Sequence, residues 1–243
     1  MSSDQPLLEL RNISYSYPGQ KSCLLDKINF RISKERIGLI GPNGSGKTTL
    51  FQIIMGLLKA SEGEVLLEGR AMENETDFRI LRRKLGLLFQ NSDDQLFSPT
   101  VLEDVAFGPL NLGTAPDEAR RISIRTLEYL GLKGFEERIT HKLSGGEKKL
   151  VALATILSMQ PKLLLLDEPS NNLDPATRER LINILRGLDQ AHIIISHDLD
   201  FLASTCTMLY TIQDKQLIRC EQKQVHSHEH IHPYGDRPHQ HGT

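Results

Sequence analysis

A glycine-rich stretch at residues 41–48 contains the residue types that bind phosphate. It reads G-P-N-G-S-G-K-T, which matches the spacing G-x-x-x-x-G-K-[ST] of a phosphate-binding loop. The glycines let backbone N–H groups turn toward phosphate oxygens, while Lys47 can reach the β- and γ-phosphates and Thr48 can offer its hydroxyl to Mg²⁺. The candidate nucleotide-binding residues of this stretch are Gly41, Pro42, Asn43, Gly44, Ser45, Gly46, Lys47, Thr48 and Thr49.

The residues on either side of this stretch fit the same interpretation. Residues 37–40 form a short apolar run that predicts a buried strand, and apolar side chains follow the loop at helical spacing. The apolar face of this predicted helix consists of Leu50, Ile53, Ile54 and Leu57. The alternative is a glycine-rich turn that only joins a strand to a helix, yet the four fixed positions recur by chance in roughly one chain in a hundred. Strand, loop and helix in this order favour nucleotide binding.

Two adjacent carboxylates follow a run of four leucines. Residues 163–166 are typical of a buried central strand, and Asp167 and Glu168 come directly after them. In a sheet that also carries a phosphate-binding loop, one carboxylate can hold Mg²⁺ and the other can orient or deprotonate an attacking water. The alternative is a turn with a helix cap.

Polar residues at other strand and helix ends are further candidates. Gln90 follows the strand predicted at residues 85–89, and His197 follows another, at the edge where open α/β sheets bind ligands. A lone histidine in such a place is more often structural than catalytic. Residues 143–146 (L-S-G-G) lead into a helix N-terminus, which is a second possible anion site or a plain loop with a capping serine. Tyr17 stands at a strand end, where its ring could stack on a base or pack within the strand.

The middle of the chain has a helical pattern. Helices are predicted between residues 91 and 159, with starts at the capping-like Thr100 and at Glu147. A further helix begins after Asp174, because aspartate is a good N-cap and proline follows it. Residues 70–76 are predicted as a polar loop.

The composition narrows the class of protein. The 243 residues include 29 Lys and Arg against 31 Asp and Glu, a net charge of −2, which gives no sign of a nucleic-acid or anionic-membrane partner. Three cysteines without C-x-x-C spacing favour reduced thiols and a cytosolic setting. No apolar run approaches the ~18–20 residues of a membrane span, and residues 1–6 lack a signal-peptide pattern. We therefore expect a cytosolic protein, which leaves docking on a membrane protein open.

The composition changes after residue 224. Six of the nine histidines lie in the last 19 residues, which have almost no core-forming side chains, so we expect this tail to be disordered unless liganded. Imidazole suits divalent transition metals such as Ni²⁺ and Co²⁺. The candidate ligands are His226, His228, His230, His232, His239 and His241. The alternative is a solubilising tail with incidental chelation.

With these motifs in hand, the chain resembles the ATP-binding subunit of an ABC transporter over almost all of residues 7–219. The resemblance implies an α/β fold: a P-loop NTPase core of the ABC ATPase type, with an antiparallel β subdomain and an inserted helical signature subdomain at about residues 96–158. It also implies an ATPase domain over residues 1–222, followed by the His-rich tail at 223–243.

The resemblance further implies a role for each motif, with ATP and Mg²⁺ as cofactors. The implied catalytic residues are Glu168 as catalytic carboxylate, His197 as switch histidine, Lys47 and Gln90. The implied Mg²⁺ ligands are Thr48, Asp167 and Gln90, the last in the Q-loop that couples to the membrane partner. The implied nucleotide contacts beyond residues 41–49 are Tyr17 on adenine, the signature residues Ser144, Gly145, Gly146 and Glu147, and Asp174 of the D-loop.

Residues 86–111 give a closer resemblance. They read G-L-L-F-Q-N-S-D-D-Q-L-F-S-P-T-V-L-E-D-V-A-F-G-P-L-N, similar to the energy-coupling-factor branch and, within it, the cobalt and nickel importers. This implies an ATP-hydrolysing subunit that powers a membrane importer of a divalent transition metal. Two alternatives stay open: the same machine serving a vitamin or another small solute, and a soluble ABC ATPase acting on nucleic acid.

The implied partners follow from the same resemblance. We expect a head-to-tail homodimer, in which Ser144, Gly145 and Gly146 of one subunit cover the ATP held by Lys47 of the other. An integral membrane coupling subunit and a substrate-specific membrane component are also expected, with no nucleic acid. The chain would then be peripheral, at the cytoplasmic face of the membrane.

Two residues depart from the family pattern. Glu147 stands where glutamine is usual, and Leu150 where a basic residue is common. Unless its side chain points away, Glu147 would add negative charge near the partner's γ-phosphate. This departure bears on turnover and leaves the predicted fold unchanged.

Overall fold

The structure is a computed structural model that describes residues 5–20 and 22–220. The strands of one sheet are β1 (Leu8–Tyr15), β2 (Leu25–Ile32), β4 (Glu62–Leu67) and β5 (Arg70–Ala71). Those of a second sheet are β3 (Arg36–Ile40), β6 (Leu85–Leu88), β7 (Leu163–Asp167), β8 (Ala191–Ile195), β9 (Met208–Gln213) and β10 (Gln216–Arg219). The helices are α1 (Lys47–Ile54), α2 (Glu75–Lys84), α3 (Val101–Asn111), α4 (Pro116–Tyr129), α5 (Gly145–Leu157), α6 (Pro175–Gly187) and α7 (Leu199–Thr205). Short 3-10 turns lie at Ser92–Asp94 and Thr140–Lys142.

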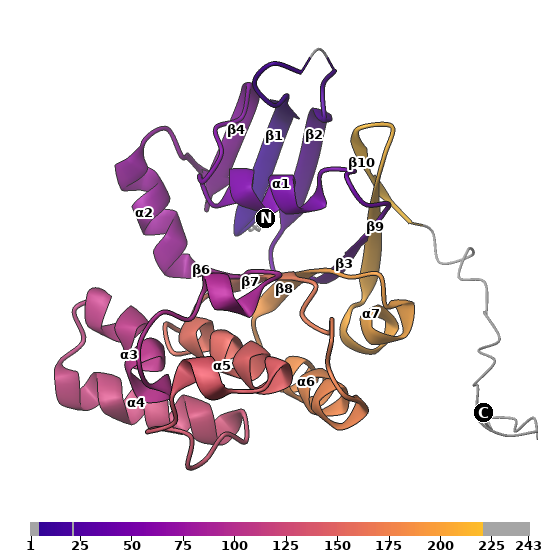
Figure 1. Cartoon of the computed structure of the whole chain (residues 1–243). Coiled ribbons are helices and arrows are strands. Elements are labelled where there is room, and N and C mark those ends of the chain that lie inside the picture. The colour runs from indigo at the N-terminus through magenta and orange to yellow at the C-terminus, as the bar shows by residue number, and fades with distance from the viewer. Residues whose placement is uncertain (1–4, 21, 221–243) are drawn as a thin grey trace, which may run out of the picture.

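The two sheets form separate layers. The four-stranded sheet is antiparallel and has the order β2-β1-β4-β5, and the six-stranded sheet has the order β10-β9-β3-β8-β7-β6. Figure 1 shows the antiparallel sheet at the top and the helices α3, α4, α5 and α6 on the opposite side of the six-stranded sheet. This α/β arrangement, with an antiparallel sheet and a group of helices inserted between β6 and β7, confirms the predicted fold class.

The leucine run in β7 explains how the layers are held together. Side chains alternate across a strand, so Leu163 and Leu165 join the core shared with the antiparallel sheet and α1. Leu164 and Leu166 face the other way and join the core built from α3, α5 and α6. All four are fully buried, as expected for a parallel strand covered on both faces.

Four parallel strands end at one edge of the sheet. In register, Leu39 of β3 and Asp167 of β7 both lie opposite Ile195 of β8, and Leu88 of β6 lies opposite Leu166. The segments that follow these strands therefore meet at this edge. They carry every candidate polar residue that the sequence placed after a strand of this sheet.

The main difference from the expected elements lies at residues 70–84. Residues 70–76, predicted as loop, contain the short strand β5 and the start of α2. Asn74 caps α2 by accepting a hydrogen bond from the Asp77 N–H, and acidic residues in the first turn and basic ones in the last suit the helix dipole. Only Asp77 and Leu81 of α2 are buried, so the apolar periodicity that marks a helix is weak.

Other helix boundaries also differ. The first helix ends at Ile54, because Gly56 takes a left-handed conformation (φ 69°), and Leu57 is half exposed instead of lying on the apolar face. Helix α5 begins at Gly145, two residues before the predicted start, and α7 was not predicted. The predicted caps at Thr100 and Asp174 are confirmed by hydrogen bonds from the helix backbone.

Candidate nucleotide-binding site

A cavity of about 500 Å³ opens at the carboxyl edge of the six-stranded sheet. The predicted site residues that line it are Tyr17, Asn43, Gly44, Gly46, Lys47, Thr48, Thr49, Gln90, Asp167, Glu168 and His197. Gln20, Leu24 and Ile195 also line it. We call the lining residues from the loop at 41–49 and from the ends of β6, β7 and β8 the phosphate edge. Gln20 and Leu24 were missed by sequence reasoning, because they belong to no motif and lie in the connection between β1 and β2.

The loop before α1 depends on its glycines. Gly41, Gly44 and Gly46 have φ values of 135°, 78° and 102°, in a region that side chains rarely adopt. Gly46 is also the N-cap of α1, and a Cβ there would lie 2.8 Å from a methyl carbon of Leu25. The backbone therefore curls at the positive end of α1, as a phosphate-binding loop requires.

The lysine of the loop is held at its mouth. Lys47 is 7% exposed, and its Nζ donates hydrogen bonds to the carbonyl oxygens of Gly41 (2.7 Å) and Pro42 (2.9 Å). Burial lowers the pKa of its ammonium, and the carboxylates of Glu168 and Asp167 partly oppose that shift. The ammonium is thus already inside the cavity, where phosphate oxygens can replace the two carbonyls.

Thr48 and Asp167 meet directly. The Thr48 hydroxyl donates to Asp167 Oδ2 at 2.7 Å, although 119 residues separate the two. Burial raises the pKa of Asp167, while this hydrogen bond and the charge of Lys47 lower it in part. The Thr48 hydroxyl, the Asp167 carboxylate and the side chain of Gln90, which lines the same cavity, offer hard oxygen ligands, so these residues fit Mg²⁺.

Glu168 and His197 form a second pair. His197 Nε2 lies 3.3 Å from Glu168 Oε1 and 3.0 Å from Asn43 Oδ1. Both neighbours are acceptors, so this nitrogen carries a proton. The other oxygen of Glu168, Oε2, is buried and lacks a hydrogen-bond partner among the described residues. Burial raises the pKa of this carboxyl group, which suits a group that takes up a proton.

Two further side chains complete the surroundings of the cavity. The Tyr17 hydroxyl lies 3.0 Å from Thr49 Oγ1, and its ring packs edge-on against Tyr15 while remaining 37% exposed. Behind Gln90, the ammonium of Lys149 donates to the Gln90 carbonyl oxygen at 2.6 Å. Burial lowers the pKa of Lys149, against the charges of Asp167 and Glu168. Sequence reasoning missed Lys149 as a site residue, since a lysine on a helix is usually solvated.

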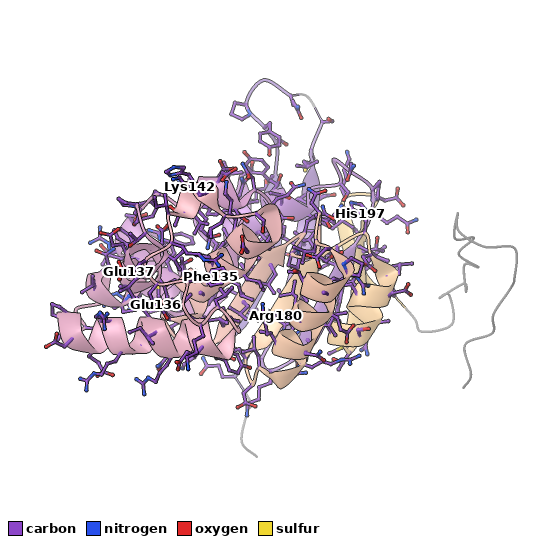
Figure 2. The ribbon with its side chains drawn as sticks, turned by 60° about the horizontal axis from the view of Figure 1, so that its bottom comes forward. Phe135, Glu136, Glu137, Lys142, Arg180 and His197 are labelled. Carbon is purple, nitrogen blue, oxygen red and sulfur yellow. The ribbon has the colours of Figure 1, made fainter. Side chains whose placement is uncertain are left out.

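The signature residues lie elsewhere. We call residues 143–147, at the start of α5, the signature edge. Among the described residues, the lining of the cavity includes Tyr17 and His197 but none of residues 144–147, and Asp174 is also absent from it. Figure 2 shows Lys142, directly before the signature edge, well apart from His197 on the same face. The structure therefore does not bring the two predicted nucleotide-contacting groups together within one chain.

Glu147 has a local partner at the signature edge. It forms a capping box with Ser144, in which its carboxylate accepts the Ser144 N–H at 2.8 Å and the Ser144 hydroxyl accepts the Glu147 N–H. Arg138 binds the same carboxylate at 2.8 Å and lies over the ring of Phe135. The hydrogen bond from Ser144 is the main cause that lowers the pKa of Glu147. The side chain is turned back onto its own helix, with its charge shared by Arg138.

The part of the chain that the structure describes offers no further metal site and no membrane span. The six tail histidines predicted as metal ligands lie outside the described residues, and within residues 5–20 and 22–220 no group of three or more His, Cys, Asp or Glu could hold a metal ion. In the same part of the chain, each helix is too short or too polar to cross a bilayer.

A phosphate-binding loop that faces a buried carboxylate pair across a parallel sheet defines a P-loop nucleoside-triphosphate hydrolase. A profile of the family described as ABC transporter matches residues 25–171. A putative ABC transporter ATP-binding protein of Nitratidesulfovibrio vulgaris is 53% identical over 99% of this chain and 88% of its own length. The energy-coupling factor transporter ATP-binding protein EcfA of Methanothermobacter thermautotrophicus is 45% identical over 87% of this chain and 70% of its own.

Solved structures agree with these sequences. CbiO1 from Clostridium perfringens, described as part of the ABC transporter complex cbiONQ, has a TM-score of 0.79 and 34% identity over 88% of this chain and 87% of its own. The ATP-binding cassette MJ0796, solved as a dimer bound to ADP and Pi, has a TM-score of 0.78 and 27% identity over 86% of this chain and 96% of its own. The chain belongs to the ABC transporter family and is an ATPase of the energy-coupling-factor type.

Proposed function

We propose that this ATPase powers a membrane importer of a divalent transition metal, nickel or cobalt. The observation that carries the proposal is the similarity to cbiO1 over nearly nine tenths of the chain. The resemblance of residues 86–111 to cobalt and nickel importers and the six histidines after residue 224 support the same substrate class.

The nucleotide is bound at the phosphate edge. The loop amides and Lys47 hold the phosphates, and the ring of Tyr17 stacks on the base. Mg²⁺, when bound, neutralises charge on the β- and γ-phosphates, and Thr48, Asp167 and Gln90 would hold it. The hydrogen bond between the Thr48 hydroxyl and Asp167 holds the two side chains together at the place where they would hold the ion.

Hydrolysis needs a base and a group that stabilises the charge on the γ-phosphate in the transition state. Glu168 fits the base, because its Oε2 is buried without a partner and its pKa is raised by burial. A water bonded to Oε2 would give up its proton there as it attacks the γ-phosphate. The Nε2 proton of His197 lies between Glu168 Oε1 and Asn43 Oδ1, and it could be donated to a γ-phosphate oxygen in place of these two acceptors.

A second subunit completes the site. The cavity is open, and the signature edge lies outside it within one chain. In a head-to-tail homodimer, Ser144, Gly145 and Gly146 of one protomer would cover the γ-phosphate held by Lys47 of its partner. The similar cassette MJ0796, solved as a dimer with ADP and Pi, supports this arrangement. ATP then holds the two protomers together, and hydrolysis releases them.

The membrane partners would dock beside the Q-loop, which we define as residues 89–95. Phe97 is 67% exposed and packs edge-on against Phe107, which is 48% exposed, and Leu110 is 45% exposed. The buried carboxylate of Asp104 accepts the N–H groups of Phe97 and Ser98, which fixes this turn. An ordered apolar surface of this kind suits a helix of a membrane coupling subunit. The ATPase would then be peripheral, at the cytoplasmic face of the membrane, with a substrate-specific membrane component in the same complex.

Uptake of radioactive nickel and cobalt tests the substrate. Cells that depend on this chain and its membrane partners should accumulate one of the two metals, and cells carrying Glu168→Gln should not. The relatives named as energy-coupling factor proteins favour a second candidate, a vitamin or another small solute. Equal metal uptake with both chains, together with loss of growth that a vitamin restores, would move the assignment to this alternative.

The tail needs its own measurement. Calorimetric titration with Ni²⁺ should show binding to the full chain and not to a chain ending at Gln224, with binding fading below about pH 6 as the histidines take up protons. Equal binding by both chains would remove the tail from the metal pathway.

A further inference from the structure

Lys149 is a buried cation whose hydrogen-bond partners are backbone carbonyl oxygens of a loop and not a carboxylate. The residue is 5% exposed, and its Nζ donates to the carbonyl oxygens of Gln90 at 2.6 Å and Phe89 at 3.5 Å. Among the described residues it forms no ion pair, whereas its neighbour Lys148 pairs with Asp93 at 2.6 Å. Lysines are almost never fully buried without an ionic partner, because the removal of an ammonium group from water is strongly unfavourable. If the side chain at position 149 only filled space in the core, an apolar residue would stabilise the fold more.

The carbonyl that Lys149 holds belongs to a residue of the nucleotide site. Gln90 lines the cavity of the phosphate edge together with Thr48 and Asp167. Among the described residues, the lining of that cavity does not include Lys149. Lys149 instead lines a neighbouring cavity with Gln90, so it contacts Gln90 from the side away from the nucleotide cavity. Its charge nevertheless acts on Asp167, where it favours the ionised carboxylate.

The same helix holds the other end of the Q-loop. The amide nitrogen of Gln95 donates to the Ala152 carbonyl (2.9 Å) and to Thr155 Oγ1 (3.0 Å), and its amide oxygen accepts the Phe89 N–H at 3.2 Å. Helix α5 therefore anchors the Q-loop at both ends. The signature edge lies at the N-terminus of α5, whose first residue, Gly145, is four positions before Lys149.

We propose that Lys149 is a positioning residue for the nucleotide site, which holds the Gln90 carbonyl so that the Gln90 side chain stands beside Thr48 and Asp167. The placement of Gln90 then depends on α5. A shift of α5 caused by a nucleotide at its N-terminus is transmitted through Lys149 to Gln90 of the same chain. The inference rests on the proposed role of Gln90 at the Mg²⁺ site.

Three substitutions separate this role from a structural one. Lys149→Met keeps the apolar stem and removes the donor and the charge. Lys149→Arg keeps both, and the cavity of about 160 Å³ that Lys149 lines with Gln90 and Asp93 gives it room. Lys162→Met is the matched control, since it removes a half-exposed ion pair with Glu68 that lies away from the Q-loop.

Steady-state hydrolysis and equilibrium ATP binding are the first measurements. For Lys149→Met we expect kcat to fall by about ten- to a hundredfold, as for other groups that orient a metal ligand. The dissociation constant for ATP should change by less than about threefold, because the loop and Lys47 still hold the phosphates. Lys149→Arg should recover most of kcat, and Lys162→Met should match the unchanged protein.

Amide hydrogen exchange of the nucleotide-free protein is the second measurement. Lys149→Met should speed exchange in residues 89–95 by about tenfold and leave residues 41–48 unchanged, because only the Q-loop loses its anchor. Unchanged exchange at 89–95, or an equal loss of kcat in Lys149→Arg and Lys149→Met, would overturn the proposal. If the Met variant does not fold, exchange in Lys149→Arg decides, since faster exchange there contradicts the role of the ammonium.

A Gln90→Ala variant distinguishes the positioning role of Lys149 from the proposed role of Gln90 at the Mg²⁺ site, on which it rests. Undiminished hydrolysis by Gln90→Ala would remove Gln90 from the catalytic site. Faster exchange of the Q-loop in Lys149→Met would then still show that Lys149 anchors the loop, but its role in the nucleotide site would be excluded.

Discussion

The phosphate edge and the signature edge differ in the origin of their contacts: one joins residues from distant parts of the chain, and the other joins residues at one helix end. At the phosphate edge, residues from distant parts of the chain already touch: Thr48 with Asp167, and Glu168 with His197. At the signature edge, Ser144 and Glu147 bond to each other, and a Cβ on Gly145 would meet nothing within 4 Å. One edge is assembled by the buried strands of its own chain. The other is the N-terminus of α5, with open space beside Gly145, and in the proposed dimer a second chain would contact it.

This difference indicates where ATP binding and ATP hydrolysis can be separated. Groups at the phosphate edge are pre-organised, so their loss should affect the chemical step within each protomer. Groups at the signature edge should affect association of protomers first and hydrolysis only through it. The predictions below test that separation. Substitutions at the phosphate edge should lower turnover first, and substitutions at the signature edge should weaken dimer formation first.

The largest effect is expected at Glu168. Glu168→Gln keeps the shape of the side chain but cannot take a proton from water, so kcat should fall by about 10²–10⁴-fold. ATP binding should survive, and because the product state does not form, an ATP-bound dimer should accumulate. Gel filtration with ATP and Mg²⁺ would show twice the mass of the nucleotide-free protein. Hydrolysis at the unchanged rate would remove Glu168 from its assigned role.

Ser144→Arg tests the other edge. A long cationic side chain cannot enter the gap beside the partner's γ-phosphate, so ATP-driven dimerisation should be lost and hydrolysis should fall by about 10²-fold. ATP binding to the monomer should be nearly unchanged, as measured by equilibrium titration. The matched control is Ser61→Arg, an exposed position in the turn before β4, which should dimerise normally. Normal dimerisation of Ser144→Arg would show that the signature edge lies outside the interface.

How far the sequence alone predicts this site depends on the kind of contact. The loop at 41–48 and the pair Asp167–Glu168 could be placed at one sheet edge, because strand order and motif spacing determine both. The pairing of Glu147 with Arg138 could not be predicted, since nine residues and a 3-10 turn separate them. The burial of Lys149 could not be predicted either, because its hydrogen-bond acceptor is the backbone carbonyl of Gln90, and every residue type has such a carbonyl.

The fold shows the same limit. Strand β7 was predicted from four leucines, whereas α2 was missed because its stability comes from Asn74 as a cap and from charges at both ends. Periodicity reports burial of a face, and α2 buries little. Elements that bury an apolar face against the core can therefore be predicted from the sequence. Helices that are stabilised mainly by caps and charges at their ends are much harder to predict.

Phe97 probes a third region, beside the Q-loop. Phe97→Asp places a charge on the exposed aromatic pair with Phe107, and should weaken assembly with the membrane subunit by about thirtyfold, as for an aromatic residue central to an interface. ATP binding should be unaffected. Leu96 is a poorer choice, because it packs against the core formed by α3 and α5. Co-purification is the measurement, with the exposed Tyr129→Asp on α4 as control. Unchanged co-purification of Phe97→Asp would exclude this surface.

The smallest effect is expected from Glu147, the residue that departs from the family pattern. Its carboxylate lies at the N-terminus of α5, where the partner's γ-phosphate would approach in the proposed dimer, and Arg138 offsets only part of the charge. Glu147→Gln keeps an oxygen that can accept the Ser144 N–H, so the capping box survives while the negative charge is removed.

An interaction between two exposed charges is worth about 0.2–1 kcal/mol, so removal of the repulsion between Glu147 and the phosphate should strengthen the ATP-bound dimer by about two- to fivefold. Sedimentation in the Glu168→Gln background, where ATP is not consumed, measures this directly. The gain should shrink at high salt, because exposed charges are screened, and Glu128→Gln on α4 should give none. A weaker dimer in Glu147→Gln would show instead that the pair with Arg138 shapes the signature edge, and that its charge is part of the contact.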